Sequence, residues 1–336
     1  MNSNENKKQD RWGNEVNVLV TGASSPLGEM VIYRLLEDSR VGKILAVCDK
    51  GAPITIAKNP RLESVTQDLR RQRGLHDLLF GKAREMNIEV VVHTSQEMKA
   101  TRTGASAHAL NVEAVRAILD FSERHPTIKR LVMRSCVEVY QVQRDLPALI
   151  SEEHPLNINS GTPQWIRDRV ESDITACTRM GLASFEILVL RMAEILAPGT
   201  GSQMYDYLQS RICLRPIGFD PMLNFLSLQD AATAIYRAVF ANQQGVFNIP
   251  GADSLPLSQV ISHWNRTSLP LLEYQISLYY RFRQTFLGGQ FRYGMNRRRF
   301  HYSGILDGRR AGVILKYIPS SPISWPDESP MSFSDS

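Results

Sequence analysis

The sequence predicts an α/β fold of the Rossmann type, a doubly wound parallel sheet with a smaller C-terminal substrate lobe. Short, β-branched apolar runs recur through the first half of the chain, and amphipathic helical patterns separate them. A glycine-containing turn joins the first apolar run to the first helical pattern. Strands that are apolar on both faces are typical of a parallel sheet covered by helices on both sides.

The expected elements alternate in order along the chain. Strands are expected at 16–20, 44–47, 64–66, 89–93, 130–133 and 185–190. Helices are expected at 27–36, 105–124 and 163–180. Crossovers between parallel strands are right-handed, so this alternation gives a doubly wound sheet.

The regular pattern weakens after residue 191. Segments 198–201 and 215–221 have the composition of loops, and 230–240 has the periodicity of a helix. We expect this region to form a lobe over the carboxyl edge of the sheet, because ligands of open α/β sheets bind in that crevice.

Composition indicates a folded protein with a large core. The chain has 336 residues, of which 43% are hydrophobic and 22% charged, and its net charge is +5. The four cysteines form no CxxC pair, so neither a disulfide framework nor a metal site is expected. The first 13 residues lack the apolar stretch of a signal peptide, and no run of about 18 apolar residues occurs, which predicts a cytoplasmic protein.

The same features suggest where the domains begin and end. We expect a disordered tail over 1–13 and an NAD-binding Rossmann domain over 14–190. A substrate lobe is expected over 191–320, with some segments returning to the sheet, followed by an irregular tail over 321–336 that is rich in serine and proline.

Residues 21–28 (TGASSPLG) lie between the first strand and the first helix, which is the context of a phosphate-binding loop. Gly22 supplies a tight turn, and Gly28 permits close packing of helix against strand. A pyrophosphate would then lie over the helix N-terminus, met by free N–H groups and the positive end of the helix dipole. The residues of this turn expected to contact the cofactor are Gly22, Ser24, Ser25, Pro26, Leu27 and Gly28.

Ser25 stands where the usual pattern has its middle glycine, and Pro26 follows it. A side chain at that position lies where backbone should approach the pyrophosphate, which reduces the expected affinity. The competing interpretation is an ordinary strand-to-helix turn that binds no ligand.

Asp49 follows the second strand, 21 residues after Gly28. A carboxylate at this place accepts hydrogen bonds from the adenosine ribose. It also repels a 2′-phosphate, so NAD is expected in preference to NADP, although the neighbouring Lys50 weakens that preference.

In this order and spacing, the motifs resemble those of the extended short-chain dehydrogenase/reductase family, in its NAD-dependent epimerase/dehydratase group. The resemblance covers roughly residues 15–320. The matching residues are TGASSPLG at 21–28, Asp49, Asp68 and Leu69, VVH at 91–93, Asn111 and Val112, RSCVEVY at 134–140, Leu190 and Arg191, FLSLQD at 225–230 and VFN at 246–248.

The resemblance implies roles for several of these residues. Asp68 and Leu69 would lie near the adenine. Ser135 would hydrogen-bond the reacting oxygen of the substrate. Further residues that would line or support the cofactor are His93, Thr94, Ser95 and Asn111.

The catalytic Tyr-x-x-x-Lys motif of the family is altered in this sequence. Its best match is WIRDR at 165–169, with Trp165 at the tyrosine position and Arg169 at the lysine position. An indole N–H only donates hydrogen bonds, and arginine stays protonated, so Arg169 can contact ribose and phosphate but cannot supply a proton. General acid–base catalysis contributes about 10²–10⁴-fold in rate, so the exchange puts activity in doubt.

Another side chain would have to replace that chemistry. The candidate substitutes are Tyr140, Glu138, Asp168 and His154, with Tyr140 first because it follows the strand that carries Ser135. Simple packing of Tyr140 is the competing interpretation. Asp168 is expected to be a solvated carboxylate or an ion-pair partner, and His154 is expected to be an exposed residue of a polar loop.

Residues 278–310 contain eight arginines and one acidic residue, Asp307, interleaved with tyrosine and phenylalanine. They fit a wall that binds the phosphates of a nucleotide-linked substrate. They also fit a contact face for RNA or anionic lipid. The third interpretation is a solvated basic surface whose aromatic side chains pack inward.

These features support two main functional hypotheses. The first is an NAD(P)-binding epimerase/dehydratase-like protein that acts on or binds a nucleotide sugar or related hydroxylated substrate. The second is a catalytically silent dinucleotide-binding scaffold or regulatory protein, because fold does not imply activity. A peripheral membrane or RNA-associated role of residues 281–310 ranks third, without strong evidence for nucleic acid or membrane. A homodimer is left open.

Overall fold

The computed structural model describes residues 15–49, 54–159 and 161–326. The expected tail over 1–13, Lys50 and the last ten residues lie outside these ranges. A seven-stranded parallel sheet forms the centre of the molecule, in the order β11-β7-β5-β4-β1-β2-β3. Its strands are β1 (Val16–Thr21), β2 (Val41–Cys48), β3 (Leu62–Thr66), β4 (Val90–His93), β5 (Arg130–Cys136), β7 (Glu186–Met192) and β11 (Gly245–Ile249). The doubly wound Rossmann-type class is confirmed.

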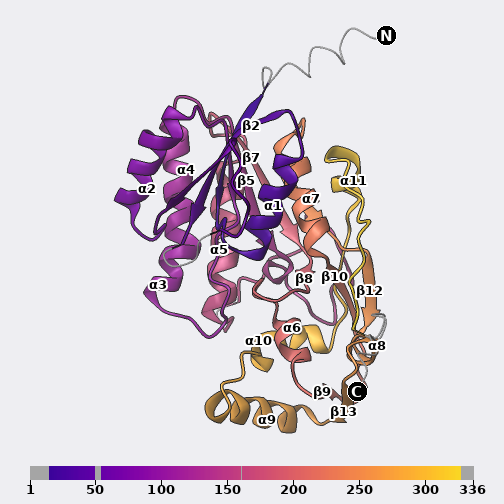
Figure 1. Cartoon of the computed structure of the whole chain (residues 1–336). Helices are drawn as coiled ribbons and strands as arrows, with labels where there is room; N and C mark the ends of the chain where they lie inside the picture. Colours follow the sequence, from indigo (N-terminus) through magenta and orange to yellow (C-terminus); the bar gives the residue numbers. More distant parts are fainter. Residues whose placement is uncertain (1–14, 50–53, 160, 327–336) are drawn as a thin grey trace, which may run out of the picture.

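Helices cover both faces of the sheet (Figure 1). One face packs against α1 (Pro26–Leu36), α7 (Leu228–Val239) and α11 (Arg309–Ile314). The other packs against α2 (Gln72–Leu78), α4 (Ala114–Arg124) and part of α5 (Gln164–Arg179). The helix expected at 105–124 is continuous but begins as α3 (Ala105–His108) and passes through a π-helical turn, η3 (Ala109–Glu113). A second such turn, η2 (Leu79–Ala83), extends α2.

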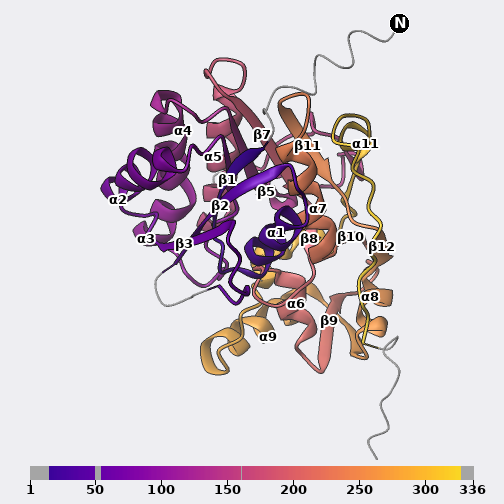
Figure 2. The ribbon, with the colours of Figure 1, turned by 45° about the horizontal axis from the view of Figure 1, so that its top comes forward.

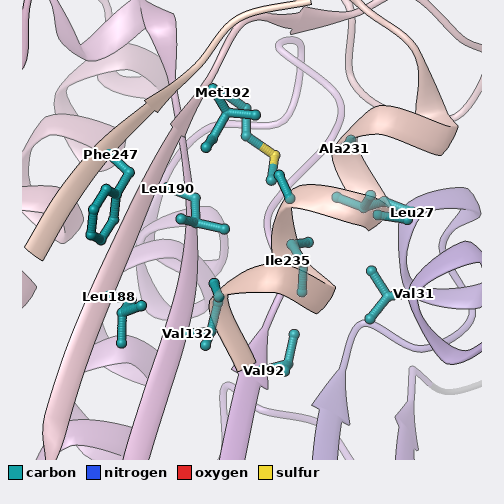
Figure 3. Packing of buried hydrophobic residues seen from close by; sticks show 14 of the residues in the cluster. Leu27, Val31, Val92, Val132, Leu188, Leu190, Met192, Ala231, Ile235 and Phe247 are labelled. Atoms are coloured by element: carbon teal, nitrogen blue, oxygen red, sulfur yellow. The ribbon is translucent and has the colours of Figure 1, made fainter. Parts of the chain in front are cut away.

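Successive side chains of each strand point to opposite faces of the sheet, so a hydrophobic core forms on each face. In β1, Val18 and Val20 belong to the core under α1 and α7, whereas Leu19 belongs to the core on the opposite face. Figure 3 shows the first core, in which Val31 of α1 and Ile235 of α7 face Val92 and Val132 of the sheet. Burial on both faces is the reason that these strands read as continuous apolar runs.

The small lobe lies at the carboxyl edge of the sheet (Figures 1 and 2). Its strands are β8 (Glu194–Ile195), β9 (Ile212–Pro216), β10 (Met222–Leu226), β12 (Asp253–Pro256) and β13 (Thr267–Leu271), and two short strands, β6 (Leu149–Ile150) and β14 (Ile305–Leu306), pair beside it. Its helices are α6 (Gln203–Leu208), α8 (Leu257–His263), α9 (Glu273–Phe286) and α10 (Tyr293–Asn296), with the 3-10 turn η5 (Arg298–Phe300). Another 3-10 turn, η4 (Val137–Val139), follows β5 of the central sheet.

Two segments from the last third of the chain pack against elements that are distant in sequence. β11 pairs with β7 at the edge of the central sheet, so residues beyond 191 contribute to the Rossmann core. The segment that follows α11 is irregular, yet Ile323 and Trp325 are buried in the core of the lobe. Among the helices of the described ranges, none has both the length and the apolar character of a membrane-spanning segment.

Candidate functional site

The turn between β1 and α1 is held by two glycines. Gly22 has a φ of +66°, and a Cβ there would lie 3.0 Å from atoms of Thr94 and Ser95 at the end of β4. A Cβ on Gly28 would lie 2.1 Å from the carbonyl oxygen of Gly22. Any side chain at either position would therefore push α1 away from the sheet or distort the turn.

The N-terminus of α1 offers fewer free donors than the sequence led us to expect. The Ser25 hydroxyl caps the helix: it accepts from the Gly28 N–H at 3.0 Å and donates to the Gly22 carbonyl at 2.7 Å. Pro26 has no N–H. Of the first three helical residues, Leu27 alone keeps an N–H without a partner among the described residues, so the expectation of several free N–H groups needs correction.

A loop from the small lobe borders this helix end. Gly199, with a φ of +71°, lies so close to Pro26 that an added Cβ would be 3.2 Å from the proline Cγ. A Cβ on Gly201 would lie 2.9 Å from the Met98 carbonyl oxygen. The segment 197–201 therefore spans from α1 to the connection after β4, along the side where a diphosphate would lie.

The outer end of the crevice is acidic. Asp49 follows β2, and burial together with the nearby carboxylates of Asp68 and Glu97 raises its pKa, while Arg70 opposes the rise. Asp68 itself pairs with Arg70 at 3.3 Å and Arg71 at 3.8 Å. Leu69 is buried in the core beneath α2, so its side chain serves packing.

The residues expected to line the cofactor at the end of β4 are buried, and two of them are hydrogen-bonded to Thr21 at the end of β1. His93 Nδ1 lies 2.8 Å from the Thr21 hydroxyl, and the Thr94 hydroxyl donates to the Thr21 carbonyl at 2.7 Å. Burial lowers the pKa of His93 to about 4, so the ring is neutral at physiological pH. Asn111 accepts the N–H of Glu97 at 2.8 Å and thereby fixes the following loop.

Ser135 borders a small cavity at the end of β5, but its hydroxyl group is bound to a buried acid. Its hydroxyl donates to Asp173 at 2.5 Å, and Asp173 forms an ion pair with Arg191 at 2.6 Å. The expected contact between Ser135 and a substrate is therefore not what this geometry shows. The next residue, Cys136, points to the opposite side of the strand, and its sulfur lies 3.5 Å from Nη1 of Arg169. Neighbouring side chains of a strand point to opposite faces, and this alternation was the signal in the sequence that could have placed Cys136 on the side of Arg169.

Tyr140 is also occupied by internal partners. Its hydroxyl donates to Asn248 at 2.6 Å and accepts from Arg191 at 3.0 Å. Burial raises the pKa of Tyr140 to about 12. The hydroxyl therefore stays protonated and bonded at neutral pH, which corrects the expectation that Tyr140 is the first substitute for the missing acid–base group.

α5 brings Trp165 and Arg169 together below the end of β5. The Arg169 guanidinium stacks on the Trp165 indole with 3.5 Å between Cζ and the ring centroid. Nη2 of Arg169 donates to the Glu97 carbonyl at 3.3 Å. Both side chains are buried, and the Trp165 Nε1 atom has no partner among the described residues.

Glu138 lies beside this pair, in the turn η4. Its side chain is 11% exposed and lies 3.7 Å from Nη1 of Arg299. Burial would raise its pKa, but Arg299 and Arg169 outweigh that effect and lower the pKa. Glu138 is therefore a carboxylate that borders both Arg169 and the large pocket described next.

A pocket of about 280 Å³ opens between the end of β5 and the small lobe. Glu138 and Ile166 line this pocket together with Arg297, Arg298 and Arg299, and Glu138 lies next to Arg299. Part of the arginine-rich segment therefore faces a ligand-sized space. Arg299 is anchored by Glu194 at 2.7 Å, whereas Arg298 is exposed.

The remainder of the arginine-rich segment is divided between surface and core. Tyr280 and Phe300 pack inward, as one of the three interpretations expects. Phe282 and Phe286 on α9, however, are 54% and 69% exposed, so the aromatic side chains do not all face the core.

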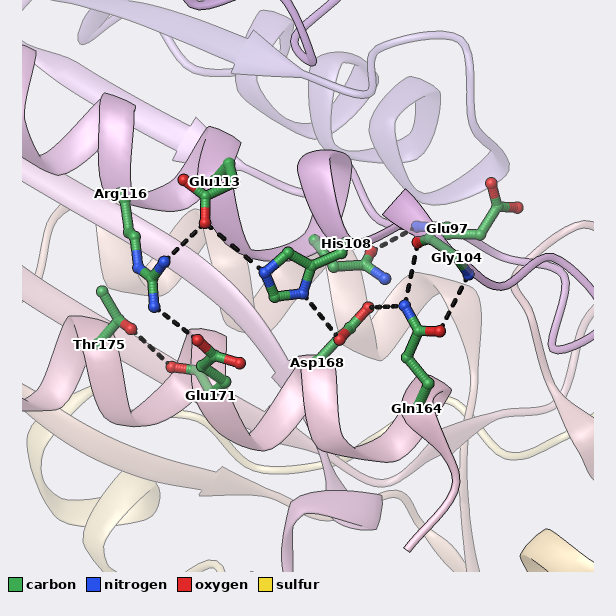
Figure 4. Close-up of polar contacts among 10 residues, drawn as sticks. Glu97, Gly104, His108, Glu113, Arg116, Gln164, Asp168, Glu171 and Thr175 are labelled. Carbon is green, nitrogen blue, oxygen red and sulfur yellow. Dashed lines mark hydrogen bonds and ion pairs between the residues drawn. The ribbon is translucent and has the colours of Figure 1, made fainter. Parts of the chain in front are cut away.

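Asp168 and His154 have structural partners. His108 Nδ1 lies 3.0 Å from Asp168, and Arg116 binds Glu113 and Glu171 on either side of them (Figure 4). Ligand atoms of His108, Asp168 and Glu171 lie within 4.8 Å of one another, and the cation of Arg116 is already paired with one of these carboxylates, that of Glu171.

His154 is buried, contrary to the exposed position expected for it. Its Nε2 atom lies 2.8 Å from the Gln141 carbonyl oxygen, and its ring packs edge-on against Tyr140. Both contacts anchor the loop that precedes α5, and they leave His154 no direct place in the pocket.

The chain was compared with family models, with curated proteins and with solved structures. No family model matches the chain. Uncharacterised proteins of Mycobacterium bovis and Mycobacterium tuberculosis are 29% identical over 260 residues, which is 76% of this chain and 67% of theirs.

Solved structures of nucleotide-sugar enzymes share the fold. A dTDP-glucose 4,6-dehydratase of Bacillus anthracis in complex with NAD superposes with a TM-score of 0.67 at 17% identity, over 91% of this chain and 92% of that one. A UDP-glucuronic acid 4-epimerase of Bacillus cereus, in complex with UDP-glucuronic acid and NAD, gives 0.67 at 15% identity, over 91% and 95%. A UDP-glucose 4-epimerase of Thermotoga maritima gives 0.66 at 14%, over 91% and 94%. The chain therefore has the fold of the epimerase/dehydratase group.

Proposed function

We propose that this chain, whose fold is that of NAD-dependent nucleotide-sugar epimerases and dehydratases, binds NAD and a nucleotide-linked, hydroxylated substrate. The observation that carries the proposal is the pocket of about 280 Å³, which is lined by three arginines of the small lobe, by Glu138 and by the start of α5. The substrate lies between the Rossmann domain (14–190) and the lobe (191–320), with its phosphates toward Arg297 and Arg298.

The residues along the crevice fit a dinucleotide at its adenosine half. Gly22 and Gly28 hold the turn, and the Leu27 N–H is free to meet a phosphate oxygen. Asp49 is half-buried at the end of β2, where a ribose needs an acceptor, and it disfavours a 2′-phosphate. When bound, NAD supplies a hydride acceptor for oxidation of a substrate hydroxyl.

Glu138 is the side chain that we assign to proton transfer. It is ionised, borders the substrate pocket and lies beside Arg169, whereas Tyr140 and Asp168 are held by internal partners. A carboxylate here would accept the O–H proton of the substrate, while the carbon that bears this hydroxyl would lose its hydride to the acceptor that bound NAD would supply. Arg299 holds Glu138 in place and favours its charged form.

Calorimetric titration of the full chain with NAD, NADP and their reduced forms tests the cofactor proposal. We expect NAD to bind more tightly than NADP. UDP-glucose and UDP-glucuronic acid are then titrated with the cofactor present, and NADH formation is followed by absorbance. A Glu138→Gln variant should keep ligand binding and lose turnover by about 10²-fold or more. Binding without turnover in the unmodified protein would favour the silent scaffold, and no binding of either dinucleotide would refute the proposal.

The assembly state and location of the protein stay predictions. Light scattering of the purified chain tests the homodimer.

A further inference from the structure

A second, smaller cavity lies behind Glu138, at the inner end of the crevice. Its walls include Arg134 of β5, Arg169 of α5 and the loop residues Thr200 and Gly201. Arg134 and Arg169 are each 6% exposed. Neither has a carboxylate within 4 Å among the residues that the structure describes, which is unusual for buried guanidinium groups.

The two guanidinium groups have weak neutral partners. Arg134 donates to the Met98 sulfur at 3.7 Å and to the Thr200 carbonyl at 3.2 Å. Arg169 donates to the Cys136 sulfur and the Glu97 carbonyl. The Nε–H of each is buried without any partner in the described part of the chain. Each group thus has unused donors in a site that excludes bulk water.

The nearby carboxylates pair with other arginines. Arg299 lies 2.7 Å from Glu194 and 3.7 Å from Glu138, and so binds both carboxylates that border the cavity. The Glu97 carboxylate lies beside Arg70 and Arg102. Three guanidinium groups therefore face two carboxylates around the cavity, which leaves an excess of one positive charge.

This excess charge persists at neutral pH. Burial, together with the charge of Arg169, lowers the pKa of Arg134 to about 10, so Arg134 stays protonated. An uncompensated buried charge costs several kcal/mol unless an opposite charge joins it. A ligand anion would supply that charge and accept the unused Nε–H donors.

We propose that this cavity is an oxyanion site, in which Arg134 and Arg169 bind an oxygen of a phosphate or carboxylate group. The space is about 20 Å³, which exceeds the roughly 10–15 Å³ that one water needs, so it admits a single oxygen. The remainder of the group lies at the mouth that the cavity shares with the large pocket through Glu138. Arginine suits both anions because its charged N–H groups make strong hydrogen bonds to carboxylate and phosphate oxygens.

The site does not depend on dinucleotide binding, so its test uses simple anions. Sodium phosphate and sodium acetate are titrated separately into the full chain by calorimetry, at constant ionic strength. Arg134→Met and Arg169→Met keep an unbranched apolar side chain in place of the arginine stem and remove the guanidinium group with its charge. Arg167→Met is the matched control, since Arg167 is exposed on the same helix two residues from Arg169.

We expect at least one anion to bind, and each pocket variant to weaken it by about tenfold or more, as loss of a charge-assisted hydrogen bond does. Arg167→Met should bind like the unmodified chain. Preference for phosphate would identify a phosphate-bearing ligand, and preference for acetate a sugar acid or other carboxylate. Without anion, Arg134→Met should melt at the same temperature or higher, because it removes an unpaired buried charge.

Three results would overturn the proposal. The first is no binding of either anion by the unmodified chain. The second is equal weakening by Arg167→Met, which would indicate a diffuse charge effect. The third is loss of thermal stability in both Arg134→Met and Arg169→Met with unchanged anion affinity, which would make both arginines structural.

Discussion

The guanidinium of Arg169 lies flat on the indole of Trp165, and the two side chains act as one buried unit. Cation–π attraction of about 2 kcal/mol at a desolvated site contributes to this unit. The sequence analysis expects this pair at the tyrosine and lysine positions of the family that the chain resembles. In the structure both side chains are buried at the start of α5.

Trp165→Ala should lower the free energy of unfolding by about 3–5 kcal/mol, because it leaves a large cavity and exposes a face of Arg169. Trp165→Phe should cost much less, since the Nε1 atom makes no hydrogen bond that would be lost. Urea denaturation followed by circular dichroism measures both. Equal losses in the two variants would contradict the stacking argument.

The buried ion pair between Asp173 and Arg191 should be important for stability. Asp173→Ala removes the partner of Arg191 and the acceptor of Ser135, and we expect a loss of about 3–5 kcal/mol. Arg34→Ala, which breaks the exposed pair with Glu37, should cost about 1 kcal/mol or less. Denaturation midpoints of both variants test the contrast, and similar midpoints would show that burial does not govern the effect.

His93 should make stability depend on pH on the acid side. Its pKa is about 4 in the fold against 6.5 when exposed, so between these values the unfolded chain binds more protons than the folded one. The stability that neutral His93 contributes is full above pH 6.5 and is lost as the pH falls toward 4. The difference corresponds to roughly 3 kcal/mol. Subtracting the profile of His93→Gln from that of the unmodified protein isolates this effect, and a flat difference would refute it.

Substitution of Gly28 in the first turn should lower stability much more than substitution of a glycine with open space around it. Gly28→Ala places a Cβ 2.1 Å from the Gly22 carbonyl oxygen, and we expect a stability loss of about 1–3 kcal/mol or more and weaker dinucleotide binding. Gly81→Ala has open space around the new Cβ and should be neutral or stabilising by about 0.4–1 kcal/mol. Thermal melts with and without NAD compare them.

Six of the seven strands of the central sheet were predicted, because short apolar runs identify them within the local sequence, whereas the edge strand β11 was not predicted. Runs such as Val90–His93 are apolar on both faces, and the β1 turn carries its own glycines. The lobe was harder to predict because distant segments complete it. Trp325 lies in a polar, proline-rich stretch and is buried only because α8 and β10 supply its surroundings.

The site shows the same division. The resemblance singled out Ser135, whose hydroxyl is bound to Asp173, and it passed over Cys136, whose sulfur lies beside Arg169. His154 was expected at the surface and is buried by contacts with Gln141 and Tyr140. Among the residues that the structure describes, Arg134 has no carboxylate within 4 Å, and this depends on where each nearby acidic side chain points, which no pattern in the sequence shows.

The contact of Gly199 with Pro26 links the two ends of the crevice. Gly199 touches the start of α1, and the adjacent Thr200 accepts a hydrogen bond from Arg134. If an anion draws Arg134 away from Thr200, the loop that borders the diphosphate position loses one of its anchors. Thermodynamic linkage then requires reciprocity: whatever factor the anion imposes on dinucleotide affinity, the dinucleotide imposes on the anion.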